Sequence, residues 1–188
     1  GDVALVPILM CAPPVAAIVG ILTFTRFANR IGKRNLIVIS LIAQAVALIG
    51  LFIAGYDSPT TVIVLSLLYG LTTFGTPLLL SMVPDCVDYS EDRTGIRTDG
   101  TSYSVISIAI KLASAIGGAV GIALIALFGY MPNVAQTDGT LWGINFVVNV
   151  LPAGLCLVGI VPLLFYRLTE DKMVDIRARL DSRGGVVS

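Results

Sequence analysis

Five long apolar runs constrain the fold of this 188-residue chain more than any other feature. The runs cover about residues 3–25, 36–55, 61–83, 101–129 and 141–166. Each approaches or exceeds the roughly 20 residues that an α-helix needs to cross the hydrocarbon core of a bilayer. Inside lipid such runs must be helices, because every backbone amide has to be bonded within its own segment. The sequence therefore predicts an all-α, polytopic membrane helix bundle that occupies residues 1–168.

The positive charges alternate along the chain as five membrane crossings require. Eleven of the twelve lysine and arginine residues fall within 26–34, 93–97 and 167–183, and none lies in the connections 56–60 and 130–140. Loops rich in lysine and arginine stay on the cytoplasmic side, so the three basic regions, including the C-terminus, are predicted to be cytoplasmic. Since neither an initiator methionine nor a basic signal sequence precedes the first run, we interpret the chain as a piece of a longer protein.

Composition argues against several classes of function. The chain has no histidine, which removes His-based proton relays, haem ligation and His-dependent triads from these residues. Its three cysteines show no C-x-x-C spacing, so neither a disulfide framework nor a metal site is predicted. The net charge is zero, so we expect no nucleic-acid partner.

One charge lies deep inside the fourth run. Lys111 is the only charged residue between residues 106 and 130, and at about 1.5 Å per residue it lies about 15 Å into a helix that starts at Thr101. A charge near the membrane centre costs about 3 kcal/mol on insertion scales, so such residues usually face a partner or a water-filled cavity. It shares one helix face with Ser104, Ser107, Ser114, Gly118 and Gly121. We interpret Lys111 as part of a transport path, with a structural lysine bonded to backbone carbonyls as the alternative.

Polar residues inside the other runs allow two interpretations each. The third run holds a dense cluster of small, hydroxylated and helix-loosening residues between Gly70 and Pro77, including Thr76. The cluster serves either close packing of backbones or a slightly unwound stretch that faces a cavity. Asn149 in the last run either faces the same cavity or joins helices, and Gln44 in the second run is expected to bond to a neighbouring helix.

The most charged segment follows the third run. Residues 84–100 contain five acids and two arginines, Arg93 and Arg97. Asp85 and Asp88 lie one helical turn apart, so their charges repel each other unless cations separate them. The available cations are these two arginines and the arginines of the first loop, Arg26, Arg30 and Arg34. We expect an ion-pair network that forms in one transporter state and breaks in another, with a solvated loop as the alternative.

Asp85 and Asp88 also allow a different class of function. Two carboxylates one turn apart could hold Mg²⁺ on a diphosphate, as in intramembrane prenyl- or alcohol-phosphotransferases. Such enzymes usually carry repeated acidic motifs, whereas this chain has one such pair. We therefore favour a transporter over an Mg²⁺-dependent, diphosphate-using transferase.

The C-terminal tail, residues 169–188, carries a short amphipathic pattern. Met173, Ile176 and Leu180 recur at helical spacing and form an apolar stripe among charged residues. We expect this helix to lie along the inner face of the membrane.

Several short motifs match a known family over nearly the whole chain. They are Arg30-Ile-Gly-Lys33-Arg34, Met82-Val-Pro-Asp85-Cys-Val-Asp88-Tyr89, Thr94-Gly95-Ile-Arg97-Thr-Asp-Gly100, Tyr103-Ser104, Lys111, Gly129-Tyr130-Met-Pro-Asn133 and Tyr166-Arg-Leu-Thr169. Together they resemble the C-terminal half of a major facilitator superfamily transporter, and more narrowly the glycoside-pentoside-hexuronide:cation symporters, the melibiose-permease-like family. The resemblance implies that the five runs are helices eight to twelve of a twelve-helix protein, and hence five helices of a six-helix half.

The resemblance also implies a function, a site and partners. The family carries a sugar or glycoside together with Na⁺, Li⁺ or H⁺, and we expect alternating access across the bacterial inner membrane. The coupling cation would be bound mainly by the N-terminal helix bundle, which lies outside this chain, and no other cofactor is implied. The residues implied near substrate and cation are Lys111, Ser107, Tyr103, Thr76 and Asn149. Those implied for the charge network are Arg30, Lys33, Arg34, Asp85, Asp88, Tyr89, Arg93 and Arg97.

Overall fold

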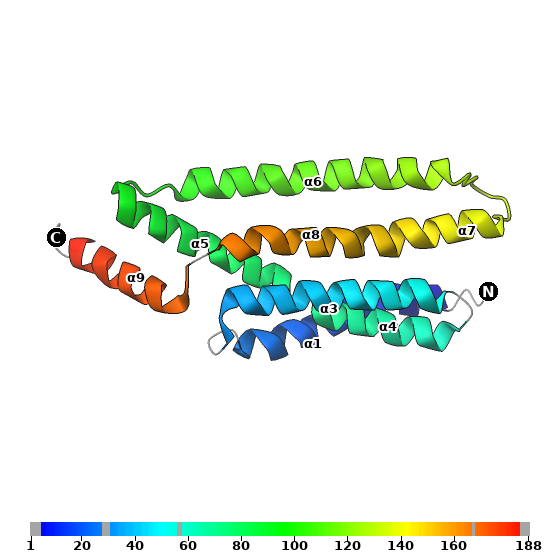
Figure 1. Cartoon of the computed structure of the whole chain (residues 1–188), viewed down its shortest axis with the longest axis horizontal. Helices are drawn as coiled ribbons and strands as arrows, with labels where there is room; N and C mark the ends of the chain where they lie inside the picture. The colour runs from blue at the N-terminus through cyan, green and yellow to red at the C-terminus, as the bar shows by residue number, and fades with distance from the viewer. Residues whose placement is uncertain (1–4, 28–30, 56–57, 167, 185–188) are drawn as a thin grey trace.

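The computed structural model describes residues 5–27, 31–55, 58–166 and 168–184, and every regular element in these residues is helical. In chain order the elements are α1 (Leu5–Phe24), η1 (Thr25–Phe27), α3 (Lys33–Ala54), α4 (Pro59–Thr72), α5 (Gly75–Thr94), α6 (Asp99–Leu127), α7 (Asp138–Asn145), η2 (Phe146–Val150), α8 (Leu151–Phe165) and α9 (Glu170–Gly184). The long helices run lengthwise beside one another, with α9 and part of α5 at one end (Figure 1). The prediction of an all-α helix bundle is confirmed.

Four helical stretches are long and apolar enough to cross a membrane. They are α3, the combined α4 and α5 (Pro59–Thr94), α6, and the combined stretch from α7 to α8 (Asp138–Phe165). The apolar part of α1, Met10–Phe24, is shorter. These lengths make the chain a multi-pass membrane helix bundle.

The third predicted span differs from the structure in two ways. α4 ends at Thr72 and α5 begins at Gly75, so the helix is interrupted where the sequence places its cluster of small and hydroxylated residues. α5 then continues through Pro84 to Thr94, well past residue 83. Apolar character ends near residue 83, but the charged turns that follow remain helical because ion pairs join them to α3, α9 and the turn before α6.

Glycines bring α1 and α4 into direct backbone contact. A Cβ atom at Gly20 of α1 would overlap the backbone of Leu71 in α4, and one at Gly70 would overlap Pro13. Small residues permit this close approach between membrane helices. α1 accommodates Pro13 and Pro14 within one helix.

α3 packs against α4, α5 and α8 and lies at the centre of the packed part of the bundle. Its larger apolar cluster consists of Leu36, Ile37, Phe74, Leu78, Met82 and Leu163, and a smaller one of Ala45, Leu48 and Ala153. Gln44 Nε2 donates to Thr72 O of α4 at 3.2 Å, so the expected bond to a neighbouring helix is present.

α6 lies apart from the other helices along most of its length (Figure 1). None of its 29 residues is buried, although the helix is apolar enough to span a membrane. Its main contacts are at its two ends, with α5 at one and with α7 and η2 at the other. A long apolar face of α6 is therefore uncovered within the described chain.

α9 packs against α5. Met173 and Ile176 are almost completely buried, with 2 % and 3 % of their surface exposed. Protein, and not the membrane surface, therefore covers Met173 and Ile176 of the apolar stripe, and the position of the helix along the inner face of the membrane stays a prediction.

Candidate functional site

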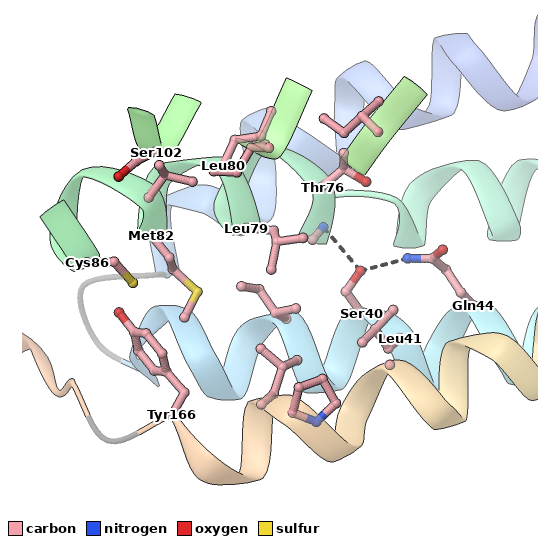
Figure 2. Close-up of a pocket in the computed structure, with 18 residues that line it drawn as sticks. Ser40, Leu41, Gln44, Thr76, Leu79, Leu80, Met82, Cys86, Ser102 and Tyr166 are labelled. Atoms are coloured by element: carbon pink, nitrogen blue, oxygen red, sulfur yellow. Dashed lines mark hydrogen bonds between the residues drawn. The ribbon is translucent and has the colours of Figure 1, made fainter. Parts of the chain in front are cut away.

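A cavity of about 660 Å³ lies between α3, α5, α6 and α8. Thr76 and Gln44 lie toward one end of it, and Cys86 and Tyr166 toward the other (Figure 2). Most of its wall consists of apolar side chains. Of the residues predicted to bind substrate, Thr76 lines this cavity.

Ser40 ties α3 to the interruption between α4 and α5. Its fully buried hydroxyl donates to Thr72 O at 2.5 Å and accepts from Gly75 N at 3.1 Å. Gln44 Nε2 also donates to the hydroxyl oxygen of Ser40 at 2.9 Å (Figure 2). A Cβ atom at Gly75 would lie 2.6 Å from Ser40 Oγ, so glycine is needed to leave room for the hydroxyl. These bonds satisfy backbone groups that the interruption would otherwise leave unpaired.

Lys111, Ser107 and Tyr103 lie on a face of α6 that does not line this cavity. The α6 residues that do line it are Ser102, Ile106 and Ile110. Since successive helical residues are about 100° apart, the row of Lys111 lies about 100° around α6 from the lining row. All three predicted side chains are exposed, and the ion pairs of the described residues do not include Lys111.

Asn149 is buried between helices and does not line the cavity. Its amide nitrogen donates to Asn145 Oδ1 at 2.7 Å and to Asn145 O at 3.1 Å. Asn145 in turn donates to Phe52 O of α3 at 3.1 Å. Asn145 therefore links α7 to α3, whereas both bonds of Asn149 stay within its own stretch of helix and hold the Asn145 side chain. The helix-joining interpretation of Asn149 stays a prediction.

Asp85 is a buried carboxylate with a cation on each oxygen. The residue is 2 % exposed, Lys33 Nζ lies 2.6 Å from Oδ2, and a guanidinium nitrogen of Arg177 lies 2.8 Å from Oδ1. A buried charge is destabilising unless it is paired and hydrogen-bonded. Each oxygen of Asp85 meets this condition, because each is hydrogen-bonded to a cation. Asp85 thereby joins α5 to the start of α3 and to α9.

Asp88 and Asp92 continue the acidic face of α5. Asp88 lies 3.4 Å from Arg177 and 3.5 Å from Arg97. Asp92 lies 2.7 Å from Arg179. We call these pairs, together with those of Asp85, the inner charge network, because the distribution of lysine and arginine predicts that this end of α5 is on the cytoplasmic side.

Arg97 closes the turn between α5 and α6. It pairs with Asp99 at 2.5 Å and with Glu91 at 2.7 Å. These two hydrogen bonds raise the pKa of Arg97 above its ordinary value, and the bond to Asp99 has the larger effect. The hydrogen bond to Asp92 likewise raises the pKa of Arg179. Both guanidinium groups therefore stay charged over the physiological pH range.

Residues 1–170 match the protein family described as MFS/sugar transport protein. The chain belongs to this family. The match confirms the resemblance to the glycoside-pentoside-hexuronide:cation symporters. Because this is a family of transporters and not of enzymes, the transferase interpretation of Asp85 and Asp88 is set aside.

Several curated relatives in this family are similar to the chain. A putative sulfoquinovose importer of Salmonella typhimurium is 32% identical over 167 residues, which cover 88% of this chain and 35% of that protein. The glucuronide carrier protein homolog of Escherichia coli is 30% identical, covering 82% and 34%. A putative 2,3-dihydroxypropane-1-sulfonate exporter of Escherichia coli is 29% identical, covering 88% and 36%. The chain of this MFS sugar transport protein thus spans about a third of the length of these relatives.

Two arginines predicted for the charge network of this MFS protein, Arg34 and Arg93, take no part in the carboxylate pairs of the described residues. Arg34 donates to Leu164 O at 3.3 Å and joins the start of α3 to the end of α8. Arg93 lies over the ring of Tyr89, 5.7 Å from its centroid, and donates to its hydroxyl at 3.1 Å. Arg30 lies outside the described residues.

Sequence reasoning missed Arg177 and Arg179 as members of the inner charge network. The apolar stripe of the tail predicts a position on the membrane surface, and that prediction gives its arginines no role as partners of α5. A signal was available, since Asp85, Asp88 and Asp92 recur at spacings of three and four on one helix face. Such an acidic face requires a matching set of cations on another element.

Proposed function

We propose that this chain is the C-terminal part of a cation-coupled sugar or glycoside symporter of the bacterial inner membrane. One observation carries the proposal: in a member of a sugar transport family, Lys111 lies mid-way along a 29-residue apolar helix that buries none of its residues. A lysine at that depth is costly in lipid and is expected to face a partner or a water-filled cavity. The chain spans about a third of its relatives' length, which leaves room in the complete protein for that partner.

The substrates that we propose are sugars or related polyols that carry a negative charge. The names of the relatives refer to sulfoquinovose, a glucuronide and a dihydroxypropane sulfonate, all of which bear a sulfonate or a carboxylate. An ammonium group in a site of low dielectric constant attracts such an anion strongly. Lys111 would bind this anion or an acidic residue of the cation site, and Ser107 and Tyr103 would supply hydroxyl groups one and two turns away.

The cavity between α3, α5, α6 and α8 is a poor match for a sugar. Sugar hydroxyl groups need hydrogen-bonding partners when they leave water, and most of this wall is apolar. We propose instead that apolar helix surface from the rest of the protein covers α6 and fills the cavity. The α1–α4 contact at Gly20 and Gly70 shows how glycines let two helices of this chain pack closely. Gly117, Gly118 and Gly121 of α6 have open space around them, so a helix from the rest of the protein could pack on α6 in the same way.

The mechanism that we propose is alternating access, in which two helix bundles rock about a site near the middle of the membrane. The coupling cation, Na⁺, Li⁺ or H⁺, would be bound mainly by the N-terminal bundle. The inner charge network would hold the inner face closed in one state and separate in the other. The basic loops and the C-terminus would be cytoplasmic, as the distribution of lysine and arginine indicates.

The test is uptake by the complete transporter carrying Lys111→Ala. Proteoliposomes are given a radiolabelled methyl glucuronide with a Na⁺, Li⁺ or H⁺ gradient. We expect uptake to fall about a hundredfold, because about 2.7 kcal/mol is within the range of hydrogen bonds to charged groups. Val134→Ala, at an exposed position of the loop after α6, is the control and should transport normally. Immunoblots of the membranes measure insertion, and normal uptake by a fully inserted Lys111→Ala protein would contradict the proposed role.

A further inference from the structure

We propose that Arg34 and one face of α8 bind an anionic phospholipid of the inner leaflet, with the phosphate on the guanidinium group and an acyl chain along the helix. The inference rests on the proposed function in one respect, which is that protein covers the cavity side of α8. The argument for the phosphate comes from the contacts of Arg34 alone.

Arg34 is a cation that has no anion beside it in the described chain. It takes part in none of the ion pairs of these residues, and its hydrogen bond goes to a neutral acceptor, Leu164 O, at 3.3 Å. The preceding residue, Lys33, instead pairs with Asp85 at 2.6 Å. Of two adjacent cations at the start of α3, one is therefore neutralised inside the bundle and the other keeps its charge at the end of α8.

The Nε atom of Arg34 lacks an acceptor. Within the part of the chain that the structure describes, it is the buried side-chain nitrogen that has no hydrogen-bond partner. Since most buried polar atoms are hydrogen-bonded, an exception calls for an explanation such as a bound ligand. Guanidinium groups bind phosphate oxygens through two parallel N–H groups. A phosphate here would supply both the acceptor and the negative charge that Arg34 lacks.

The helix surface next to Arg34 is apolar. Leu164, whose carbonyl oxygen accepts from Arg34, is exposed, and the following Phe165 is 77% exposed. Exposed apolar side chains continue along the same face, and we call this set the α8 apolar row: Leu157, Val158, Val161, Leu164 and Phe165. The row is about 12 Å long, close to the roughly 15 Å of hydrocarbon in one leaflet. An acyl chain that begins beside Arg34 would have apolar protein surface along most of its length.

The α8 apolar row and the cavity lie on opposite faces of α8. The cavity is lined from this helix by Gly159, Pro162, Leu163 and Tyr166. At about 100° per residue, Val161 lies about 160° around α8 from Leu163. The proposed function assigns the cavity side to the rest of the protein, which leaves the row to lipid. Acyl chains are as apolar as leucine, so such a row needs no protein cover.

The predicted topology brings Arg34 to the level of the lipid phosphates. Arg34 lies in the first turn of α3, directly after a basic loop that is predicted to be cytoplasmic. Basic sites between membrane helices on this side bind anionic headgroups. Because no carboxylate of the described residues pairs with Arg34, the ammonium group of a zwitterionic lipid would find no such partner at this arginine. We therefore expect a lipid with a net negative charge, such as phosphatidylglycerol.

Native mass spectrometry of the complete transporter tests the site without any transport substrate. Protein in detergent is titrated with dioleoylphosphatidylglycerol, and the dissociation constant of the first bound lipid is measured. We expect Arg34→Gln to raise this constant about tenfold, because a hydrogen bond between two charged groups is lost. Arg26→Gln, which removes one positive charge from an exposed position on η1 in the same basic region, is the matched control and should leave the constant unchanged.

Competition on the unmodified transporter separates a lipid from a free anion, and it does not depend on how well Arg34→Gln folds. Labelled dioleoylphosphatidylglycerol is bound first, and an excess of a competitor is then added. The unlabelled lipid should displace it. Inorganic phosphate, which has no acyl chain, and dioleoylglycerol, which has no phosphate, should each leave most of it bound.

Each contrary result would overturn the inference. Equal lipid binding by wild type and Arg34→Gln would mean that the rest of the transporter covers Arg34, and an equal loss in Arg26→Gln would indicate a general effect of charge. Displacement by inorganic phosphate would show a plain anion site, and displacement by dioleoylglycerol would show a site that does not use the phosphate. If the transporter takes up no anionic sugar, the proposed function fails, and the lipid titration still decides whether Arg34 binds a phospholipid.

Discussion

Asp85 and Lys111 both place a charge within a helix, and the chain surrounds them in opposite ways. Asp85 is 2% exposed and holds cations from α3 and α9 on its two oxygens. Lys111 is exposed on a helix that buries none of its residues, and it takes part in none of the ion pairs of the described chain. The inner end of α5 is therefore complete within these residues, whereas the middle of α6 is not. A buried charge that is paired within the chain, like that of Asp85, stabilises the fold of the chain itself. A charge without such a pair, deep in an apolar helix, indicates a partner elsewhere.

Asp85→Asn should have the largest effect on the stability of this chain. It removes the negative charge that Lys33 and Arg177 share. Breaking a buried pair can cost about 3–5 kcal/mol, but both cations are partly exposed, so we expect a loss of about 2–3 kcal/mol in the free energy of unfolding. Thermal unfolding in detergent measures it.

The control for Asp85→Asn is Asp99→Asn, whose carboxylate is 45% exposed. If the two variants unfold at the same temperature, the buried ion pairs of Asp85 do not stabilise the inner end of α5. The contrast between a satisfied charge at Asp85 and an unsatisfied one at Lys111 would then fail.

Ser40→Ala should have an intermediate effect. It leaves Gly75 N without its acceptor and Thr72 O without its donor from Oγ, inside a buried site. Leaving a buried polar group unsatisfied costs about 1–3 kcal/mol, and Gln44 can still bond Thr72 O, so we expect about 1–2 kcal/mol. Ser104→Ala, at an exposed position of α6, is the matched control. Equal thermal stability of the two variants would show that Ser40 does not hold the interruption together.

Lys111→Met should have the smallest effect on this chain. Since Lys111 has no charged partner in the described residues, we expect its loss to change the free energy of unfolding by less than about 0.5 kcal/mol. In the complete transporter we expect the same substitution to lower uptake about a hundredfold, as for Lys111→Ala, which sharpens the contrast between the two charges. A loss of about 2 kcal/mol in the chain alone would break the comparison, because it would reveal a partner for Lys111 within these residues.

Much of the fold could be predicted from hydropathy and charge. Apolar runs of membrane-spanning length predicted the helices, because lipid forces such segments to satisfy their own backbone. The cluster between Gly70 and Pro77 indicated where the third span is interrupted. What hydropathy could not predict was the continuation of α5 to Thr94, because that continuation depends on ion pairs with elements distant in sequence.

The candidate site was predictable only in part, for two different reasons. Arg177 pairs with Asp85 across 92 residues, and the amphipathic pattern of α9 fits a membrane surface as well as a protein surface. Lys111 could be singled out from its depth, but its role stays a prediction, because none of the ion pairs of the described residues includes it. Thr76 lines the cavity and Asn149 does not, a difference that depends on helix rotation and not on residue type.

The pairing of Asp85 has a consequence for how the protein is made. Lys33 precedes Asp85 by 52 residues, whereas Arg177 follows it by 92. At the usual ribosomal rate of about 5–20 residues per second, the second cation is synthesised roughly 5–18 seconds after Asp85. During that interval the nascent chain has Lys33 available for this carboxylate, so α5 can dock on α3 first and α9 is added to a bundle that is already partly assembled.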